Sequence, residues 1–269
     1  MPRYDRLSIL VSLTLFGLVV SQVIELPTRT ISFVALGVPT TIYLSGRWLI
    51  GALLVVLVGT GMDSIVRSHP WARNAVWEYS LSFWGVPCAF TLLSLFLLPL
   101  SPDKYLWLAG LALTGILLAL LIIAQYRTID RRDRYYGVAR WGLNLVVYVS
   151  IAVFCTLIYG ARARSLLSAT AISVLAAALA AESLRLEASR QAMRRTWLYS
   201  LVVGAIMGEV AWALNHLTLG DAAAGILFLL VFYVVSGLAL QHLRERLVRR
   251  VMVEFIVVSL LGLGLLYLV

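Results

Sequence analysis

The sequence predicts an all-α bundle of nine or ten membrane-spanning helices with no soluble domain. Of the 269 residues, 61% are hydrophobic and 13% are charged, whereas a soluble domain carries about 25% charged residues. The charged residues stand between apolar runs about as long as the roughly 20 residues that cross a bilayer. The connections between these runs are too short for a folded soluble domain. Residues 1–269 are therefore expected to form a single transmembrane domain.

The charge-poor runs follow one another along the chain. They are 7–24, 30–46, 48–62, 79–102, 105–126, 141–161, 165–181, 196–220, 222–243 and 251–269. The run 30–46 is the weakest, because it is short and contains Gly37 and Pro39; it is expected to be a kinked span or a re-entrant hairpin with its neighbour. Ten spans would divide into possible halves 1–126 and 141–269, as in inverted-repeat transporters. No sequence echo between the halves supports such a repeat.

The basic residues predict an orientation, because cytoplasmic loops of membrane proteins collect Lys and Arg. With ten spans, one side carries Arg29, Arg67, Arg73, Arg127, Arg131, Arg132, Arg134, Arg140, Arg185, Arg190, Arg194, Arg195, Arg244, Arg246, Arg249 and Arg250. This side is expected to face the cytoplasm from a bacterial inner membrane. Arg3 and Arg6 would then lie outside, a conflict that disappears if nine segments span.

The net charge of +9 is explained by these loops, so no nucleic-acid partner is expected. The expected partner is the lipid bilayer itself. The run from Arg127 to Arg140, with tyrosines 126, 135 and 136 interleaved, fits anionic lipid headgroups, although ordinary orientation signalling explains it equally well.

Acidic residues near the ends of the runs are spaced to pair with arginines. The pairs are Asp63 with Arg67, Glu182 with Arg185, and Arg250 with Glu254. Spacings of three or four place both partners on one helix face, and each arginine is expected to snorkel toward water at the cytoplasmic boundary. His69 lies in a polar stretch on the same side, where it would either touch a substrate or be merely solvated.

Glu209 differs from these acids, because it lies deep in a run without a basic residue on its helix. Trp212 and His216 follow on the same stripe, with Asn215 beside them, and Gly204 and Gly208 form a G-x-x-x-G contact surface just before it. Glu209 is therefore expected to point into the bundle, within hydrogen-bonding distance of a polar group on another helix. Such a group would handle protons or a polar ligand, or simply hold helices together.

Familiar catalytic and metal-binding patterns do not occur in the sequence. It has no H-E-x-x-H, G-x-S-x-G or Walker A motif, and Cys88 and Cys155 stand alone in apolar runs. No metal site, cofactor or catalytic residue is predicted, and enzymatic activity is not favoured.

The chain resembles an uncharacterised family of bacterial multi-pass membrane proteins, a domain of unknown function. The resemblance rests on the segment from Glu209 to His216, on 232–237 (FYVVSG), on Glu254 with Phe255, and more loosely on His69-Pro70 with Trp77 and Pro87. It implies membership and no activity. The expected function is thus that of an inner-membrane protein of unknown activity, acting as a structural or assembly partner of a membrane complex. The alternatives are a small secondary transporter or lipid flippase using Glu209, and a membrane enzyme acting on a lipid or isoprenoid.

Overall fold

The computed structural model describes residues 4–24, 29–35, 38–44, 46–70, 72, 77–162, 165–186, 193–217 and 219–243. The candidate span 251–269, with Arg250 and Glu254, lies outside these residues. So does the whole Arg-rich segment 244–250 that precedes it.

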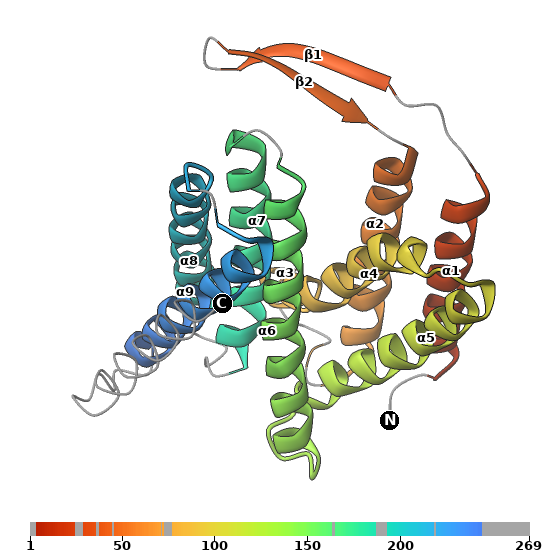
Figure 1. Ribbon diagram of the computed structural model, residues 1–269. Helices are drawn as coiled ribbons and strands as arrows, with labels where there is room; N and C mark the ends of the chain where they lie inside the picture. The colour runs from red at the N-terminus through yellow and green to blue at the C-terminus, as the bar shows by residue number, and fades with distance from the viewer. Residues whose placement is uncertain are drawn as a thin grey trace.

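Long helices make up most of the described chain, which confirms the all-α bundle (Figure 1). They are α1 (Tyr4–Val23), α2 (Gly46–Val66), α3 (Trp77–Leu81), α4 (Gly85–Leu97), α5 (Lys104–Arg127), α6 (Tyr136–Gly160), α7 (Ser165–Arg185), α8 (Met193–Leu214) and α9 (Asp221–Leu243). Eight helical segments of the described residues are long and apolar enough to cross a membrane, counting 79–100 as one segment that joins the end of α3, α4 and a 3₁₀ turn.

The expected second span is wrong: residues 30–35 and 38–44 form strands and not a helix. Arg29–Ala35 (β1) and Val38–Leu44 (β2) pair antiparallel, with Arg29 opposite Leu44 and Ala35 opposite Val38. The segment is rich in β-branched residues, which favour strands, and Pro39 in β2 disfavours a helix. The hairpin stands away from the helices at the end where α1 finishes and α2 begins (Figure 1).

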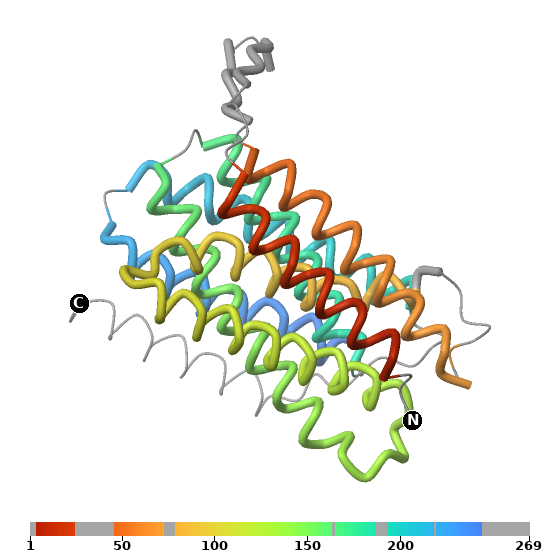
Figure 2. Tube along the Cα trace, turned by 90° about the vertical axis from the view of Figure 1, so that its right-hand side faces the viewer, coloured from red at the N-terminus to blue at the C-terminus, as the bar shows by residue number. Residues whose placement is uncertain are grey.

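Because no helix lies between them in the chain, α1 and α2 are consecutive helices, and they pack side by side in antiparallel directions. Arg6 at the start of α1 donates hydrogen bonds to the Ser64 carbonyl and hydroxyl near the end of α2, at 3.1 and 2.7 Å. The N-terminal end of α1 therefore lies beside the end of α2. We call this end of the bundle the Arg-rich end, and the opposite one the hairpin end. Figure 2 shows the start of α1 and the α5–α6 connection at the same end.

Two groups of helices pack around α4. On one side α1, α2 and α5 bury residues such as Met62, Leu118 and Ile122; on the other, α6 to α9 bury a larger core that includes Ile151 and Phe228. The start of α4 presses on α7, because a Cβ at Gly85 would lie 2.6 Å from the Ala178 carbonyl oxygen. Glycine is therefore required for this approach, which holds the two groups together.

Candidate functional site

The expectation that Glu209 is buried is wrong for the described part of the chain. Its side chain is exposed on the outside of α8 and has no hydrogen-bond or ion-pair partner among the described residues. Trp212 is 53% exposed and follows on the same stripe. His216 is exposed as well, and its Nδ1 lies 2.9 Å from the Trp212 carbonyl oxygen. These three residues form an outward stripe near the hairpin end of α8.

The glycines that predicted burial do make a close contact, but on another face. A Cβ at Gly204 would lie 2.5 Å from the Ser173 carbonyl oxygen, and one at Gly208 would lie 3.1 Å from Ser173 Cβ. Both glycines therefore face α7. A helix turns about 100° per residue, so the residue after Gly208 points well away from the helix that Gly208 contacts. The G-x-x-x-G pattern predicted the contact correctly and the direction of Glu209 wrongly.

Asn215 belongs to the α7 contact rather than to the outward stripe. Its Nδ2 donates a hydrogen bond of 2.6 Å to Ser168 Oγ near the start of α7. The predicted set of Glu209, Trp212, Asn215 and His216 is thus divided between two faces of α8, and it does not form one polar track.

The position of Glu209 along α8 limits its energetic cost. It precedes Leu214, the last residue of the helix, by five residues, which is about 7.5 Å at 1.5 Å per residue. A carboxyl at the centre of a bilayer costs about 3 kcal/mol. At this shallower depth the cost is smaller, which is compatible with an exposed position.

Asp63 and Arg67 form the ion pair that their spacing predicts, at the Arg-rich end. Arg67 Nε lies 2.9 Å from both carboxylate oxygens, and the side chains of Arg67 and Asp63 are 43% and 33% exposed. Ser80 in α3 also donates its hydroxyl proton to Asp63. The pair therefore ties the end of α2 to the beginning of the next segment.

The Glu182–Arg185 pair is buried, although Arg185 was expected to snorkel into water. The two side chains are 0% and 2% exposed. Arg185 Nη2 donates to Glu182 Oε1 at 2.5 Å, and Nε donates to Oε2 at 3.2 Å. The guanidinium is enclosed because two other segments reach it: Thr128 accepts a hydrogen bond of 3.3 Å, and the Phe83 ring lies 3.7 Å from Arg185 Cζ.

Gln125 on α5 is fully buried, although the sequence did not indicate it as a site residue. Its side-chain oxygen and nitrogen have no hydrogen-bond partner within the part of the chain that the structure describes. It lies one turn after Leu121, which packs in the α6–α9 core, and three residues before Thr128, which reaches Arg185. Leu121, Gln125 and Thr128 thus lie on the side of the α5 segment that faces the α6–α9 group. A polar residue inside an apolar run was the available signal.

Other contacts bring the remaining polar residues of the Arg-rich end together. Tyr136 at the start of α6 donates a hydrogen bond of 2.9 Å to the Leu186 carbonyl, just after α7. His69 is half-buried, and its ring packs against Tyr126 at a centroid distance of 4.9 Å. Segments 127–140 and 185–186 therefore lie at one end of the bundle.

The chemistry of these groups favours binding and packing over catalysis. Glu182 and Arg185 are the fully buried charged residues of the described chain, and they neutralise each other. Among the residues that the structure describes, no three His, Cys, Asp or Glu side chains are placed to hold a metal ion. The Glu209 carboxyl is exposed and has no partner among the described residues.

Comparison with known proteins yields one finding. A family model described as "Protein of unknown function (DUF5656)" matches residues 26–269. No curated protein and no solved structure matches the chain.

Proposed function

The chain belongs to the DUF5656 family, and we propose that it is an assembly partner in a membrane complex that binds another membrane protein through the outer face of α8. We define the α8 outer face as Leu201, Ala205, Glu209, Trp212 and His216, which are all exposed. The observation that carries the proposal is Glu209 on the spanning helix α8, whose exposed carboxyl has no partner among the residues that the structure describes.

The proposed occupant is a membrane helix of another protein with a hydrogen-bond donor at the level of Glu209. A carboxyl that faces hydrocarbon is stabilised when such a donor replaces the water it has lost. Trp212 adds a large, exposed aromatic surface one turn away, of the kind that dominates contact energies in interfaces.

A second copy of this chain is a poorer fit to the same face. Two copies inserted in the same direction would bring α8 against α8 in parallel, with the two Glu209 carboxyls at the same depth. Like groups at one level repel when ionised, so a different chain that supplies a donor satisfies the face better.

The transporter and enzyme alternatives have less support. A proton- or substrate-coupling group has to line a path through the bundle, and Glu209 lies on its outside. An enzyme needs at least two facing polar groups, and Glu209 has no polar partner among the described residues.

The test places a photoreactive amino acid at Ala205 on the α8 outer face, or at Leu53 on α2, which is 70% exposed, as the control. Crosslinking in intact membranes is expected to give an adduct with a different protein from position 205 and none of comparable yield from position 53. Glu209→Leu should lower the yield about five-fold, the effect of losing one hydrogen bond of about 1 kcal/mol. Glu209→Gln should retain most of it, because an amide also accepts a hydrogen bond.

Three outcomes would overturn the proposal. They are adducts with lipid alone, an adduct between two copies of this chain, and an internal adduct with residues 251–269. Peptide mass spectrometry of the crosslinked band distinguishes them from a foreign chain.

We also propose that the Arg-rich end faces the cytoplasm, in a bacterial inner membrane. The hairpin supports this orientation. If 30–46 does not cross the membrane, Arg3 and Arg6 lie on the same side as most of the basic residues, and Arg29 lies on the opposite side. All but five of the basic residues would then be cytoplasmic, as orientation by positive charge favours. In single-cysteine variants, Lys104→Cys should react with an impermeant maleimide in intact cells, and Arg132→Cys should not. The reverse result would place the Arg-rich end outside.

A further inference from the structure

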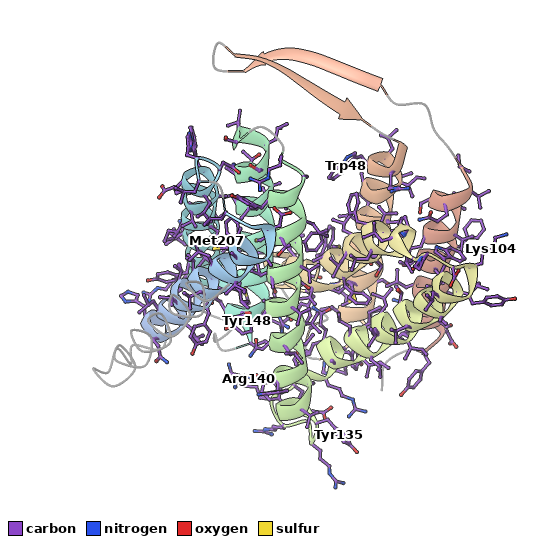
Figure 3. All side chains as sticks on the ribbon, viewed as in Figure 1. Trp48, Lys104, Tyr135, Arg140, Tyr148 and Met207 are labelled. Carbon is purple, nitrogen blue, oxygen red and sulfur yellow. The ribbon has the colours of Figure 1, made fainter. Side chains whose placement is uncertain are left out.

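The connection between α5 and α6 forms a compact basic elbow, which we define as residues 127–141. It carries five arginines and two aspartates. Figure 3 shows Tyr135 at the lower tip of the molecule and Arg140 above it on α6. The elbow thus projects from the Arg-rich end of the bundle.

The two aspartates of the elbow hold its backbone rather than neutralise all of its arginines. Asp130 accepts a hydrogen bond of 2.9 Å from the Arg132 backbone N–H, and Asp133 accepts one of 2.8 Å from the Tyr135 N–H. Asp133 also lies 3.6 Å from the Arg127 guanidinium, which stacks over the Tyr135 ring at 4.3 Å. These contacts give the elbow a defined shape.

Arg132 and Arg134 are exposed on this ordered frame. Arg132 and Arg134 make no ion pair with an acidic side chain among the residues described. Arg134 stands two residues before α6, and its Cζ lies 6.0 Å from the Tyr135 ring centroid. Both guanidinium groups can therefore donate to an external anion.

The level of the membrane at the elbow follows from the length of α6. Trp141 is 73% exposed and stands where an interfacial tryptophan belongs. From Trp141 to Gly160, the last residue of α6, the helix rises about 29 Å, close to the roughly 30 Å of a hydrocarbon core. Trp141 therefore marks the hydrocarbon boundary, and Arg132 and Arg134 lie beyond it at the level of the lipid headgroups.

We propose that the elbow is a binding site for the headgroup of an anionic phospholipid, with Arg132 and Arg134 as donors to its phosphate. Val138, Trp141 and Leu145 are exposed and, spaced by three and four residues, lie on one face of α6. Arg134 precedes Val138 by four residues, just before the helix begins, so a lipid that lies along this face with its acyl chains below Trp141 brings its phosphate to the elbow. An isolated orientation signal would need the charges but not this alignment.

The test titrates the full chain, purified in a mild detergent, with phosphatidylglycerol or phosphatidylcholine and counts bound lipids by native mass spectrometry. The unsubstituted protein is expected to prefer phosphatidylglycerol. Arg132→Gln with Arg134→Gln should lower that preference about five-fold for each arginine removed, the effect of roughly one basic residue near an anionic surface. Membrane orientation plays no part in this measurement, because the protein is in detergent.

The matched control is Arg194→Gln with Arg195→Gln, which removes two exposed arginines from the start of α8 at the same end. It should leave the preference unchanged. Trp141→Ala should weaken both lipids equally. Equal loss in the control, no loss in the elbow variant, or full displacement by inorganic phosphate would each overturn the proposal. Thermal unfolding should be unaffected by the elbow substitutions, because both side chains are exposed. The result is independent of whether α8 has a protein partner.

Discussion

Removing one partner of the buried Glu182–Arg185 pair should destabilise the protein far more than removing both. In Arg185→Met the Glu182 carboxyl, which is 0% exposed, is left without its counter-ion. The loss of one partner from a buried pair costs about 3–5 kcal/mol. The cation–π contact between Arg185 and Phe83 is lost as well, which places the expected cost at the upper end of that range.

The double variant Glu182→Met with Arg185→Met should be much less affected. Apolar side chains of similar volume often replace a buried ion pair at little cost, because the charges no longer have to be desolvated. Thr128 keeps a partner in that variant, since its hydroxyl donates 2.7 Å to the Gln125 carbonyl. We expect a loss of about 0–2 kcal/mol, so the coupling between the two sites exceeds about 3 kcal/mol.

The free energy of unfolding can be measured by titrating sodium dodecyl sulfate into mixed micelles and following tryptophan fluorescence. Arg67→Met is the internal control, because the Asp63–Arg67 pair has the same kind of partners but is 33% and 43% exposed. Exposed pairs contribute about 0–1 kcal/mol. Two results would contradict the burial of the pair. They are a loss of stability in Arg185→Met no larger than in Arg67→Met, and a double variant as unstable as the single one.

Three further substitutions test contacts between helices by the same unfolding measurement. Gly204→Leu should destabilise the protein by at least about 2 kcal/mol, because its Cβ alone would lie 2.5 Å from the Ser173 carbonyl oxygen on α7. Gly137→Leu should cost little, because nothing lies within 4 Å of a Cβ at that position. Equal effects of the two substitutions would refute the close packing. Tyr159→Phe removes a hydroxyl that donates 2.8 Å to the Leu217 carbonyl, and should cost about 1 kcal/mol. Asn215→Leu removes the bond to Ser168 and should cost a similar amount; an unchanged stability would mean that the amide makes no such bond.

The lengths of the charge-poor apolar runs sufficed to predict the described spanning helices, but they gave the wrong structure for 30–46. Length and absence of charge identify a span only when the chain is helical. The β-branched residues of β1 and β2 and Gly37 between them in the sequence favoured strands, but the prediction followed the hydropathy of the segment. A pair of strands and a short kinked span can have the same composition, so composition alone does not distinguish them.

The spacing of charged residues predicted partners but not depth. Asp63–Arg67 and Glu182–Arg185 have similar spacings and both pairs form, yet one is exposed and the other is enclosed. The difference comes from Phe83 and Thr128, which are distant in the sequence from Arg185. Burial by segments far along the chain cannot be deduced from local spacing. The direction of Glu209 was misjudged for another reason: it follows Gly208 by one residue, which places it about 100° around the helix from the face that contacts α7.

The contact between α7 and α8 also restricts how the bundle can move. Ser173 on α7 and Gly204 on α8 bring the two backbones so close that no side chain larger than a hydrogen atom fits between them. Sliding one helix along the other would drive Cβ atoms into carbonyl oxygens at each intermediate step. We therefore expect α7 and α8 to move together as one rigid unit, so that any relative movement of helices in the described bundle takes place outside this contact.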